Sequence, residues 1–310
     1  MRHAWVFPGQ GSQSVGMGRE LAEREPAART VFEEMDAVLG FPLSRIVFEG
    51  PAEALAATRN QQPALLATSI AYLRVLEARG ALPVPTLVAG HSLGEYTALV
   101  AVDSLEFADA LRLVRLRGEL MEAHGEGGML VVIGLPRERL AAIAAETGVE
   151  LANENAPDQL TLSGRDRPLD HAAELAKAAG AKRVVRLPVN AAFHSSLMRP
   201  VAEELARVLA TVPIRLPRVP LVACSTGRVL ADPEDLRHEL IAQIAAPVRW
   251  VDVVRRAVEL GVTDFWEIGP GQVLSGLIRR IAPAATTVTA EQLLRGHAVP
   301  AARADRPKEG

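Results

Sequence analysis

The sequence has one cysteine, few aromatic residues and no long apolar run, and each shortage excludes a class of protein. Cys224 stands alone among 310 residues, so the chain cannot form an internal disulfide, and we expect it in the reducing cytoplasm. No apolar stretch approaches the roughly 20 residues that cross a bilayer, so we expect no membrane span. Aromatic residues make up 4% of the chain, so leucine, valine, isoleucine and alanine must build its core.

The sequence also lacks an excess of charge of one sign. It carries 34 basic and 37 acidic side chains, a formal net charge of -3, which provides no positive field for a phosphate backbone. We therefore expect no nucleic-acid partner. A hydrophobic content of 49% over this length predicts a folded α/β protein, either one large domain or a large domain with a smaller insert.

The motif Gly90-His91-Ser92-Leu93-Gly94 predicts a nucleophile. The residues before it have strand character and residues 95–102 favour a helix. In this strand-turn-helix context the two glycines let the chain reverse without a Cβ clash, which holds Ser92 on a strained corner. The backbone N–H of Leu93 would then face the oxygen of a carbonyl under attack. An ordinary glycine-bracketed turn is the alternative, against which the flanking strand and helix argue.

The helix predicted at residues 106–123 contains an unusually placed arginine. Spacings of four, three and four put four residues in one row on its surface: Ala110, Val114, Arg117 and Met121. An arginine in an apolar row is costly to bury unless an anion meets it. One explanation is a structural carboxylate, or a side chain that reaches out to solvent. The other is a substrate carboxylate, held through two hydrogen bonds as a guanidinium allows.

The first predicted strand, at residues 4–7, ends in a glycine-rich loop. The glycine spacing fits neither a dinucleotide-binding nor a P-loop motif, and no lysine follows. We interpret the loop as one that brings backbone N–H groups and the Gln10 amide close to a ligand. Helical patterns follow at residues 17–39 and 63–79, the second with Pro63 at its start.

The pattern changes after a glycine-rich break at residues 125–128. The order is then strand, helix, strand, strand, helix and strand, at residues 129–135, 137–147, 149–153, 159–163, 169–179 and 182–187. This β-α-β-β-α-β order is that of a ferredoxin-like unit. We therefore expect a subdomain at residues 125–190, inserted into a larger α/β domain formed by residues 1–124 and 191–295. The tail at residues 296–310 is expected to be disordered.

A serine nucleophile needs a general base, and histidine has the pKa for that work. Of seven histidines, His194 lies in a small-residue loop that closes the insert, where a cleft between subdomains would be. A surface histidine in a loop is the alternative. His91 adjoins Ser92, but neighbouring side chains at a strand end point to opposite sides, so it is poorly placed as the base. No aspartate is an evident third member, which leaves a backbone carbonyl to orient the imidazole.

Six motifs follow one another along the chain. They are Phe7-Pro8-Gly9-Gln10-Gly11-Ser12-Gln13, Gly90-His91-Ser92-Leu93-Gly94-Glu95-Tyr96, Arg115-Leu116-Arg117-Gly118, Phe193-His194-Ser195, Pro247-Val248-Arg249-Trp250 and Glu267-Ile268-Gly269-Pro270-Gly271. Together they resemble the malonyl-CoA:acyl carrier protein transacylase family, which includes acyltransferases of fatty acid and polyketide synthesis. The resemblance covers residues 3 to about 290. It implies an α/β fold with a hydrolase-like parallel-sheet core that carries the ferredoxin-like insert.

The resemblance also implies catalytic roles for particular residues. Ser92 corresponds to the acylated nucleophile and His194 to its base. Gln10 and the N–H of Leu93 would form the oxyanion hole. The family orients the imidazole through main-chain carbonyls, and Gln243 matches the position concerned.

The substrates follow from the same resemblance. Arg117 corresponds to the arginine that binds the free carboxylate of a malonyl group, and we expect Met121, Phe193 and His91 to contact the acyl group. The implied reaction is ping-pong transfer of malonyl from malonyl-CoA to the phosphopantetheine thiol of an acyl carrier protein, without a cofactor or metal. Phe193 resembles an aromatic residue that crowds out an α-methyl group, a distinction worth about 1–3 kcal/mol.

Other interpretations stay open on the sequence alone. A serine thioesterase or hydrolase would share Ser92 and His194 but would give no reason for Arg117. An acyltransferase selective for methylmalonyl or another acyl group, and a non-catalytic acyl- or carrier-binding module, are further alternatives. Residues 164–190 carry six basic side chains against three acidic ones, which fits a solvated face or a docking surface for an acidic carrier protein. We expect a monomer that serves fatty acid synthesis or acts in trans on polyketide synthases.

Overall fold

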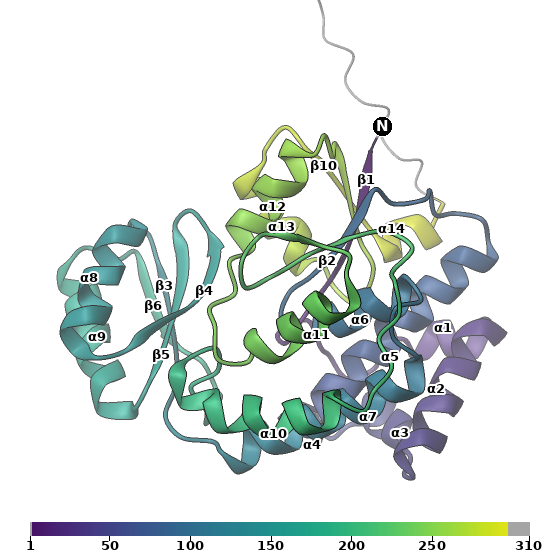
Figure 1. Cartoon of the computed structure of the whole chain (residues 1–310), viewed down its shortest axis with the longest axis horizontal. Coiled ribbons are helices and arrows are strands. Elements are labelled where there is room, and N and C mark those ends of the chain that lie inside the picture. Colours follow the sequence, from purple (N-terminus) through teal and green to yellow (C-terminus); the bar gives the residue numbers. More distant parts are fainter. Residues whose placement is uncertain (1, 297–310) are drawn as a thin grey trace, which may run out of the picture.

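Two β-sheets organise the chain, each with its own helices (Figure 1). The computed structural model describes residues 2–296, so residues 297–310 of the predicted tail lie outside the described part. The first sheet has six strands in the order β10-β9-β1-β2-β7-β8, and the second has four in the order β4-β5-β3-β6. The predicted fold class, an α/β fold with a parallel-sheet core and an inserted ferredoxin-like unit, is confirmed.

The first sheet is parallel except at one edge. Its strands are β1 (His3–Phe7), β2 (Leu87–Gly90), β7 (Leu221–Val222), β8 (Val229–Leu230), β9 (Asp264–Glu267) and β10 (Thr286–Thr289). The short β8 pairs antiparallel with β7, and the sequence analysis did not predict it. Phe7 pairs with Gly90, so β1 and β2 end at the same edge of the sheet. Ligands of open parallel sheets bind at this carboxyl edge.

Alternate residues of β1 face two different apolar clusters, which shows that both faces of the first sheet are covered. Trp5 and Phe7 join a cluster that includes residues of α5 (Thr58–Ala78), α6 (Gly94–Ala101) and α7 (Phe107–Ala123). Ala4 and Val6 face the opposite cluster, with α12 (Trp250–Glu259) and α13 (Val273–Ile281). Burial on both faces explains why the central strands are continuous apolar runs.

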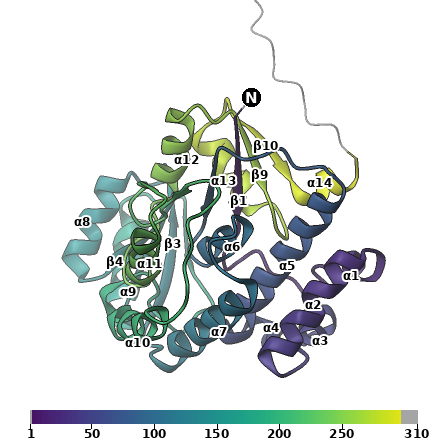
Figure 2. The same cartoon turned by 45° about the vertical axis from the view of Figure 1, so that its right-hand side comes forward.

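Further helices surround this core. Beside α5 lie α1 (Arg19–Arg24), α2 (Pro26–Leu39), α3 (Leu43–Glu49) and α4 (Ala52–Ala56), drawn in purple in Figure 2. The remaining ones are a short 3₁₀ turn (Ser196–Met198), α10 (Arg199–Leu209), α11 (Pro233–Ala242) and α14 (Ala290–Leu294). Among residues 2–296, no helix combines the length and the apolar character that a membrane span requires.

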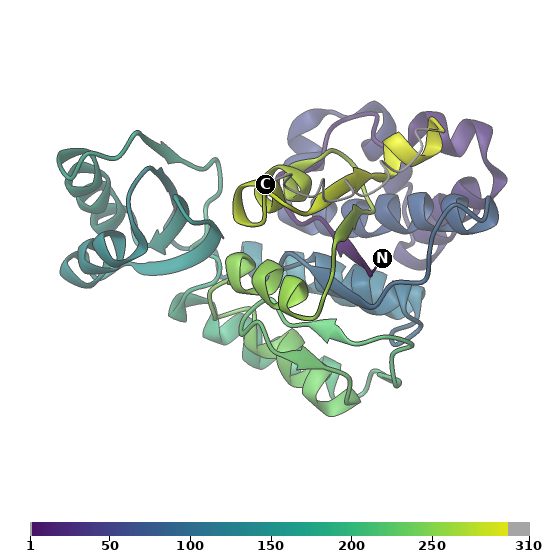
Figure 3. The same cartoon turned by 90° about the horizontal axis from the view of Figure 1, so that it is seen from above.

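The second sheet stands to one side of the first (Figure 3). Its strands are β3 (Gly128–Ile133), β4 (Glu150–Ala156), β5 (Gln159–Gly164) and β6 (Arg183–Arg186), and all its pairs are antiparallel. The helices α8 (Arg137–Thr147) and α9 (Asp166–Ala178) pack on it around a separate apolar cluster. All these elements fall within residues 125–190, and every strand of the first sheet falls outside that range.

Main-chain hydrogen bonds at Val248 join the two parts. The Val248 N–H donates to the carbonyl of Ala152 (2.8 Å), and its own carbonyl accepts from the N–H of Glu154 (2.7 Å). Val248 thus pairs in parallel with β4, the edge strand of the second sheet, and covers part of its open edge. The segment after α11 is therefore fixed to the insert.

The expectation for Pro63 is wrong. Proline was expected at a helix start, but α5 begins at Thr58 and Pro63 lies inside it. A proline inside a helix cannot donate to the carbonyl four residues earlier, here that of Arg59. Arg115 Nη1 of the neighbouring α7 lies 3.4 Å from that carbonyl and donates to it instead. A tertiary contact thus replaces the missing helical bond.

The single helix expected at residues 17–39 is in fact two helices. They meet at Glu25, whose backbone is extended (φ -116°, ψ 113°). The residue before a proline is disfavoured in helical conformation, and Pro26 follows here at the first position of α2. The proline therefore ends α1 and begins α2.

Candidate active site

Ser92 occupies the turn between β2 and α6. Its φ of 53° lies in the left-handed region, which residues other than glycine rarely adopt. A Cβ on Gly90 would lie 2.0 Å from the carbonyl carbon of Gly94, and one on Gly94 would lie 2.1 Å from the carbonyl oxygen of Phe7. The turn can therefore close only with glycine at both positions. This is the strained corner expected of a nucleophilic serine.

The loop after β1 packs against this corner. A Cβ on Gly9 would come within 2.4 Å of the carbonyl oxygen of His91. Within residues 2–296, the backbone N–H groups of Gln10 and Leu93 have no hydrogen-bond acceptor. The side-chain amide of Gln10 donates to Gln61 Oε1 of α5 (2.5 Å). These two N–H groups are thus available to a ligand oxygen, while the Gln10 side chain is held by the protein.

His194 lies beside Ser92 although 102 residues separate them. Its Nε2 is 2.9 Å from Ser92 Oγ. Its Nδ1 faces two carbonyl oxygens, those of Gln243 (2.8 Å) and Ala246 (3.2 Å). Because a carbonyl can only accept, Nδ1 carries the proton and Nε2 presents its lone pair to the hydroxyl. His194 also has a left-handed φ of 57°, so both partners of this pair are conformationally strained.

The electrostatic surroundings keep this imidazole neutral. Burial, followed by the positive charge of Arg117, lowers the pKa of His194 to about 3. At pH 7 the ring is therefore unprotonated and able to accept the proton of Ser92.

The Arg117 guanidinium is fully buried and meets Ser92 from another side. Its Nη2 donates to Ser92 Oγ (2.9 Å) and to Gln243 Oε1 (3.0 Å), and its Nη1 donates to Gln62 Oε1 (2.8 Å). Its Cζ lies 5.8 Å from the ring centroid of Tyr96, a cation–π contact. No carboxylate among residues 2–296 forms an ion pair with it, and its Nε lacks a hydrogen-bond partner there.

The unmatched charge of Arg117 is energetically costly. Burial lowers the pKa of Arg117 from its usual value. The sequence offers two structural explanations for this arginine, a carboxylate that pairs with it or a side chain that reaches solvent. Within the described residues it forms no ion pair, and the side chain has no exposed surface. Neutral acceptors hold the guanidinium, so an anion that entered the site would be its first charged partner.

The structure places three further predicted site residues nearby. Met121 is buried one helical turn after the arginine, and its Sδ accepts from Gln62 Nε2 (3.3 Å). Phe193 directly precedes the histidine of the pair, and 5% of its surface is exposed. His91 Nε2 contacts Asn155 Oδ1 of β4 (2.8 Å), so it links the serine turn to the insert.

Two buried polar residues at this site are not predicted from the sequence. Gln62 and Glu95 both have no exposed surface. Glu95 is the only charged residue among residues 95–102, which are otherwise apolar except for Thr97. The same anomaly drew attention to Arg117, so the signal was present in the sequence. Gln62 gave no comparable signal, because it lies among other polar residues before Pro63.

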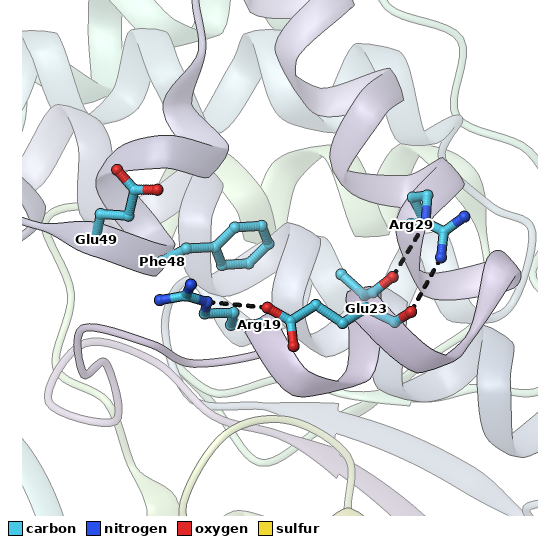
Figure 4. A pocket seen from close by; sticks show the side chains of 6 residues that line it. Arg19, Glu23, Arg29, Phe48 and Glu49 are labelled. Atoms are coloured by element: carbon cyan, nitrogen blue, oxygen red, sulfur yellow. Dashed lines mark hydrogen bonds and ion pairs between the residues drawn. The ribbon is translucent and has the colours of Figure 1, made fainter.

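Two surface hollows lie away from Ser92, and no predicted site residue lines either. Figure 4 shows one beside α1, whose charged groups are already engaged: Arg19 Nε donates to Glu23 (3.1 Å), and Arg29 donates to the carbonyls of Ala22 (3.3 Å) and Glu23 (3.0 Å). In the other, the arginines pair with glutamates: Arg24 with Glu20, Arg79 with Glu25, and Arg295 with Glu291. The arginines of both hollows are thus already hydrogen-bonded or ion-paired within the protein.

Comparisons with known proteins identify relatives of this chain. The family described as "Acyl transferase domain" matches residues 4–296. A malonyl CoA-acyl carrier protein transacylase of Bacillus subtilis is 46% identical over 286 residues, which cover 90% of each chain. The polyketide biosynthesis protein ThaF of Burkholderia thailandensis is 43% identical over 286 residues, which are 91% of this chain and 24% of ThaF.

A solved structure resembles the whole fold. It is a type II PKS acyl-carrier protein in complex with its malonyl-transacylase. Its matching chain is 39% identical, with a TM-score of 0.92, and the match covers 96% of this chain and all of that one.

Proposed function

This chain belongs to the family of malonyl CoA-acyl carrier protein transacylases and is an acyltransferase, and from that premise we propose that it transfers malonyl from malonyl-CoA to an acyl carrier protein through a malonyl ester of Ser92. The observation that carries the proposal is the buried Arg117 guanidinium, which has no carboxylate partner within residues 2–296 and lies 2.9 Å from Ser92 Oγ. A malonyl group joins a thioester to a free carboxylate. The site offers a nucleophile for the first and a cation for the second.

The first half-reaction acylates Ser92. The malonyl carboxylate binds Arg117, which places the thioester carbonyl at the serine. His194 Nε2 takes the hydroxyl proton as Oγ attacks the carbonyl carbon, and the N–H groups of Gln10 and Leu93 stabilise the oxyanion. When the tetrahedral intermediate collapses, the carbon–sulfur bond breaks and His194 protonates the departing CoA thiolate. The products are free CoA and the malonyl ester.

The second half-reaction reverses these steps with a different thiol. The phosphopantetheine thiol of the carrier gives its proton to His194 and attacks the ester carbonyl. Collapse of the second tetrahedral intermediate breaks the bond to Ser92 Oγ, and His194 returns the proton to the serine. The carbonyls of Gln243 and Ala246 hold the imidazole through Nδ1 in both half-reactions. The other ring nitrogen, Nε2, therefore serves first as the base and then as the acid in each half-reaction. Every step uses this chain's own side chains and main chain, and the proposed reaction includes no metal or cofactor.

A hydrolase is the strongest competing function, since it needs the same serine and histidine. It does not require Arg117, whose burial without a counterion is costly unless an anionic substrate repays it. Met121, Phe193 and His91 are proposed to contact the acyl group. Selection against methylmalonyl by Phe193 is a steric matter of about 1–3 kcal/mol, so it is expected to be partial.

The basic side chains of the insert are the proposed docking surface for the carrier. Several of them are already paired: Arg165 with Glu126, and Arg186 with Asp166 and Asp170. Lys182 and Arg183 are exposed and form no ion pair within residues 2–296, so they keep their charge for a partner. The solved complex of a related transacylase with an acyl-carrier protein supports this class of partner.

The relatives include transacylases and a polyketide biosynthesis protein. The proposal therefore covers the supply of malonyl-loaded carrier protein to fatty acid synthesis or to polyketide synthesis. A monomeric state and a cytoplasmic location stay predictions from the sequence.

Transferase and hydrolase activity are separated by the fate of the acyl group. The protein is mixed with labelled malonyl-CoA in the presence and absence of a phosphopantetheine-bearing carrier protein, and malonyl-carrier and free malonate are quantified over time. We expect malonyl-carrier to form many times faster than malonate. Faster release of malonate, with the carrier left unloaded, would establish a hydrolase instead.

A further inference from the structure

Glu95 is a buried carboxyl group that the reaction described above does not use. It lies three residues after Ser92, in the first turn of α6, and has no exposed surface. Its Oε1 accepts from the backbone N–H of Cys224 (2.6 Å), and its Oε2 accepts from Gln243 Nε2 (3.1 Å). Both oxygens therefore face donors. Burial, followed by the nearby Glu239, raises the pKa of Glu95 well above its usual range.

The Gln243 side chain connects this carboxyl group to the site. Its Nε2 donates to Glu95 Oε2 and to the carbonyl of Ser92 (3.0 Å), and its Oε1 accepts from Arg117 Nη2 (3.0 Å). The main-chain carbonyl of Gln243, by contrast, serves His194. The side chain and the main chain of this residue thus have separate tasks, one at the arginine and the other at the base.

The direction of the Gln243 amide matters because only one orientation suits Arg117. A guanidinium can only donate, so it needs the amide oxygen and would be repelled by the amide nitrogen. Glu95 Oε2 and the carbonyl oxygen of Ser92 together impose that orientation, because both accept from the nitrogen end of the amide. Each oxygen of Glu95 acts as an acceptor here, because each faces an N–H donor, and a proton on the carboxyl group would have to point away from both donors.

We propose that Glu95 is a positioning residue for acyl selectivity, which fixes the Gln243 amide so that its oxygen holds Arg117 ready for the substrate carboxylate. The inference rests on the proposed role of Arg117 in binding malonyl. It assigns Glu95 no contact with substrate, and it predicts an effect confined to substrates that carry a free carboxylate.

The isosteric substitution Glu95→Gln tests this role. Glutamine keeps the size of the side chain but accepts at one oxygen only. If that oxygen stays with the N–H of Cys224, the new NH₂ group faces Gln243 Nε2, and two donors oppose each other. The Gln243 amide then keeps the Ser92 carbonyl as an acceptor but loses Glu95, so its oxygen is held less firmly at Arg117.

The matched control is Glu239→Gln. Glu239 is another buried glutamate close to Glu95, but its carboxylate accepts from the N–H and hydroxyl of Ser225 and not from Gln243. The rates of enzyme acylation by malonyl-CoA and by acetyl-CoA are measured for each variant over a range of concentrations.

We expect Glu95→Gln to lower kcat/KM for malonyl-CoA about 10-fold to 100-fold, the scale of one charge-assisted hydrogen bond. The value for acetyl-CoA should change less than about threefold, since no carboxylate is involved, and Glu239→Gln should leave the malonyl-to-acetyl ratio at the wild-type value. Equal losses with both substrates, or no loss with either, would overturn the inference.

Two further variants keep the test decisive. Gln243→Leu removes the amide but retains the main-chain carbonyl that serves His194, so it should reproduce the malonyl-specific loss even if Glu95→Gln fails to fold. In an Arg117→Ala background, Glu95→Gln should no longer alter the malonyl-to-acetyl ratio. If Arg117→Ala itself leaves that ratio unchanged, the proposed function fails. If only Arg117→Ala changes it, the inference about Glu95 alone fails.

Discussion

Replacing Arg117 by alanine removes a buried cation that faces Ser92. The wild-type guanidinium is anchored by neutral oxygens of Gln62, Gln243 and Ser92, at distances of 2.8 to 3.0 Å, and has no exposed surface. A malonyl carboxylate that enters the variant site would lose its counterion and stay in a buried surrounding, where residues 2–296 offer no other buried arginine or lysine to pair with it. The loss falls on substrates with a free carboxylate.

The size of this loss follows from the burial of the charge. Leaving one partner of a buried ion pair without its counterion costs about 3–5 kcal/mol. At about 1.4 kcal/mol for each factor of ten, kcat/KM for malonyl-CoA should fall roughly 100-fold to several thousand-fold. Acetyl-CoA has no carboxylate to lose a partner, and the variant no longer holds an unmatched guanidinium. Its kcat/KM should fall much less or rise.

The assay compares the two substrates in one experiment. Wild-type and Arg117→Ala protein are acylated with mixtures of malonyl-CoA and acetyl-CoA, and the two acyl-enzymes are counted by intact mass. Arg117→Lys is the matched control, because it keeps the positive charge but loses the planar two-point contact, and it should give an intermediate ratio. If Arg117→Ala keeps the wild-type ratio of malonyl-enzyme to acetyl-enzyme, Arg117 is a structural residue and the reasoning fails.

Three further predictions follow from the site and from the insert. Burial, followed by Arg117, lowers the pKa of His194 to about 3, so the imidazole stays unprotonated as the pH falls. The value of kcat/KM for acetyl-CoA should therefore be flat from pH 8 to about pH 5. A decline centred at about 6.5, the pKa of an unperturbed histidine, would contradict this. Phe193→Ala should raise acceptance of methylmalonyl-CoA relative to malonyl-CoA by about 10-fold or more, and an unchanged ratio in competition assays would remove the steric role of Phe193. Charge reversal at Lys182 and Arg183 should raise the KM for the carrier protein several-fold at low salt without altering acylation by malonyl-CoA, whereas an unchanged KM would place docking elsewhere.

The local part of the site was predictable because its cause is local. Two glycines around a serine, between a strand and a helix, define the corner at Ser92, and the structure shows why no other residue fits at Gly90 or Gly94. The buried arginine was predictable for a similar reason, since helical spacing alone places Arg117 in an apolar row. The insert, with four strands and two helices, follows the predicted order of its elements, because strand and helix patterns are clearly distinct there.

What the sequence did not reveal depends on contacts between distant segments. Pro63 lies inside a helix because Arg115 of another helix satisfies the carbonyl that the proline leaves free, and no local pattern encodes that contact. The role of Gln62 as an acceptor for Arg117 likewise arises only when α5 packs on α7. Glu95 was visible as a lone charge, but its link to the arginine runs through Gln243, which lies 148 residues further along the chain.

The central claim, that Ser92 carries the malonyl group during transfer, is tested most directly by trapping the acyl-enzyme. The protein is incubated with malonyl-CoA in the absence of any carrier, quenched in acid, and its mass and peptide map are recorded beside those of Ser92→Ala. The account predicts one added malonyl group, located on Ser92, that disappears when a carrier thiol is supplied and never forms in the variant. An unmodified wild-type protein that still loads the carrier, or a malonyl group that persists in Ser92→Ala, would contradict it.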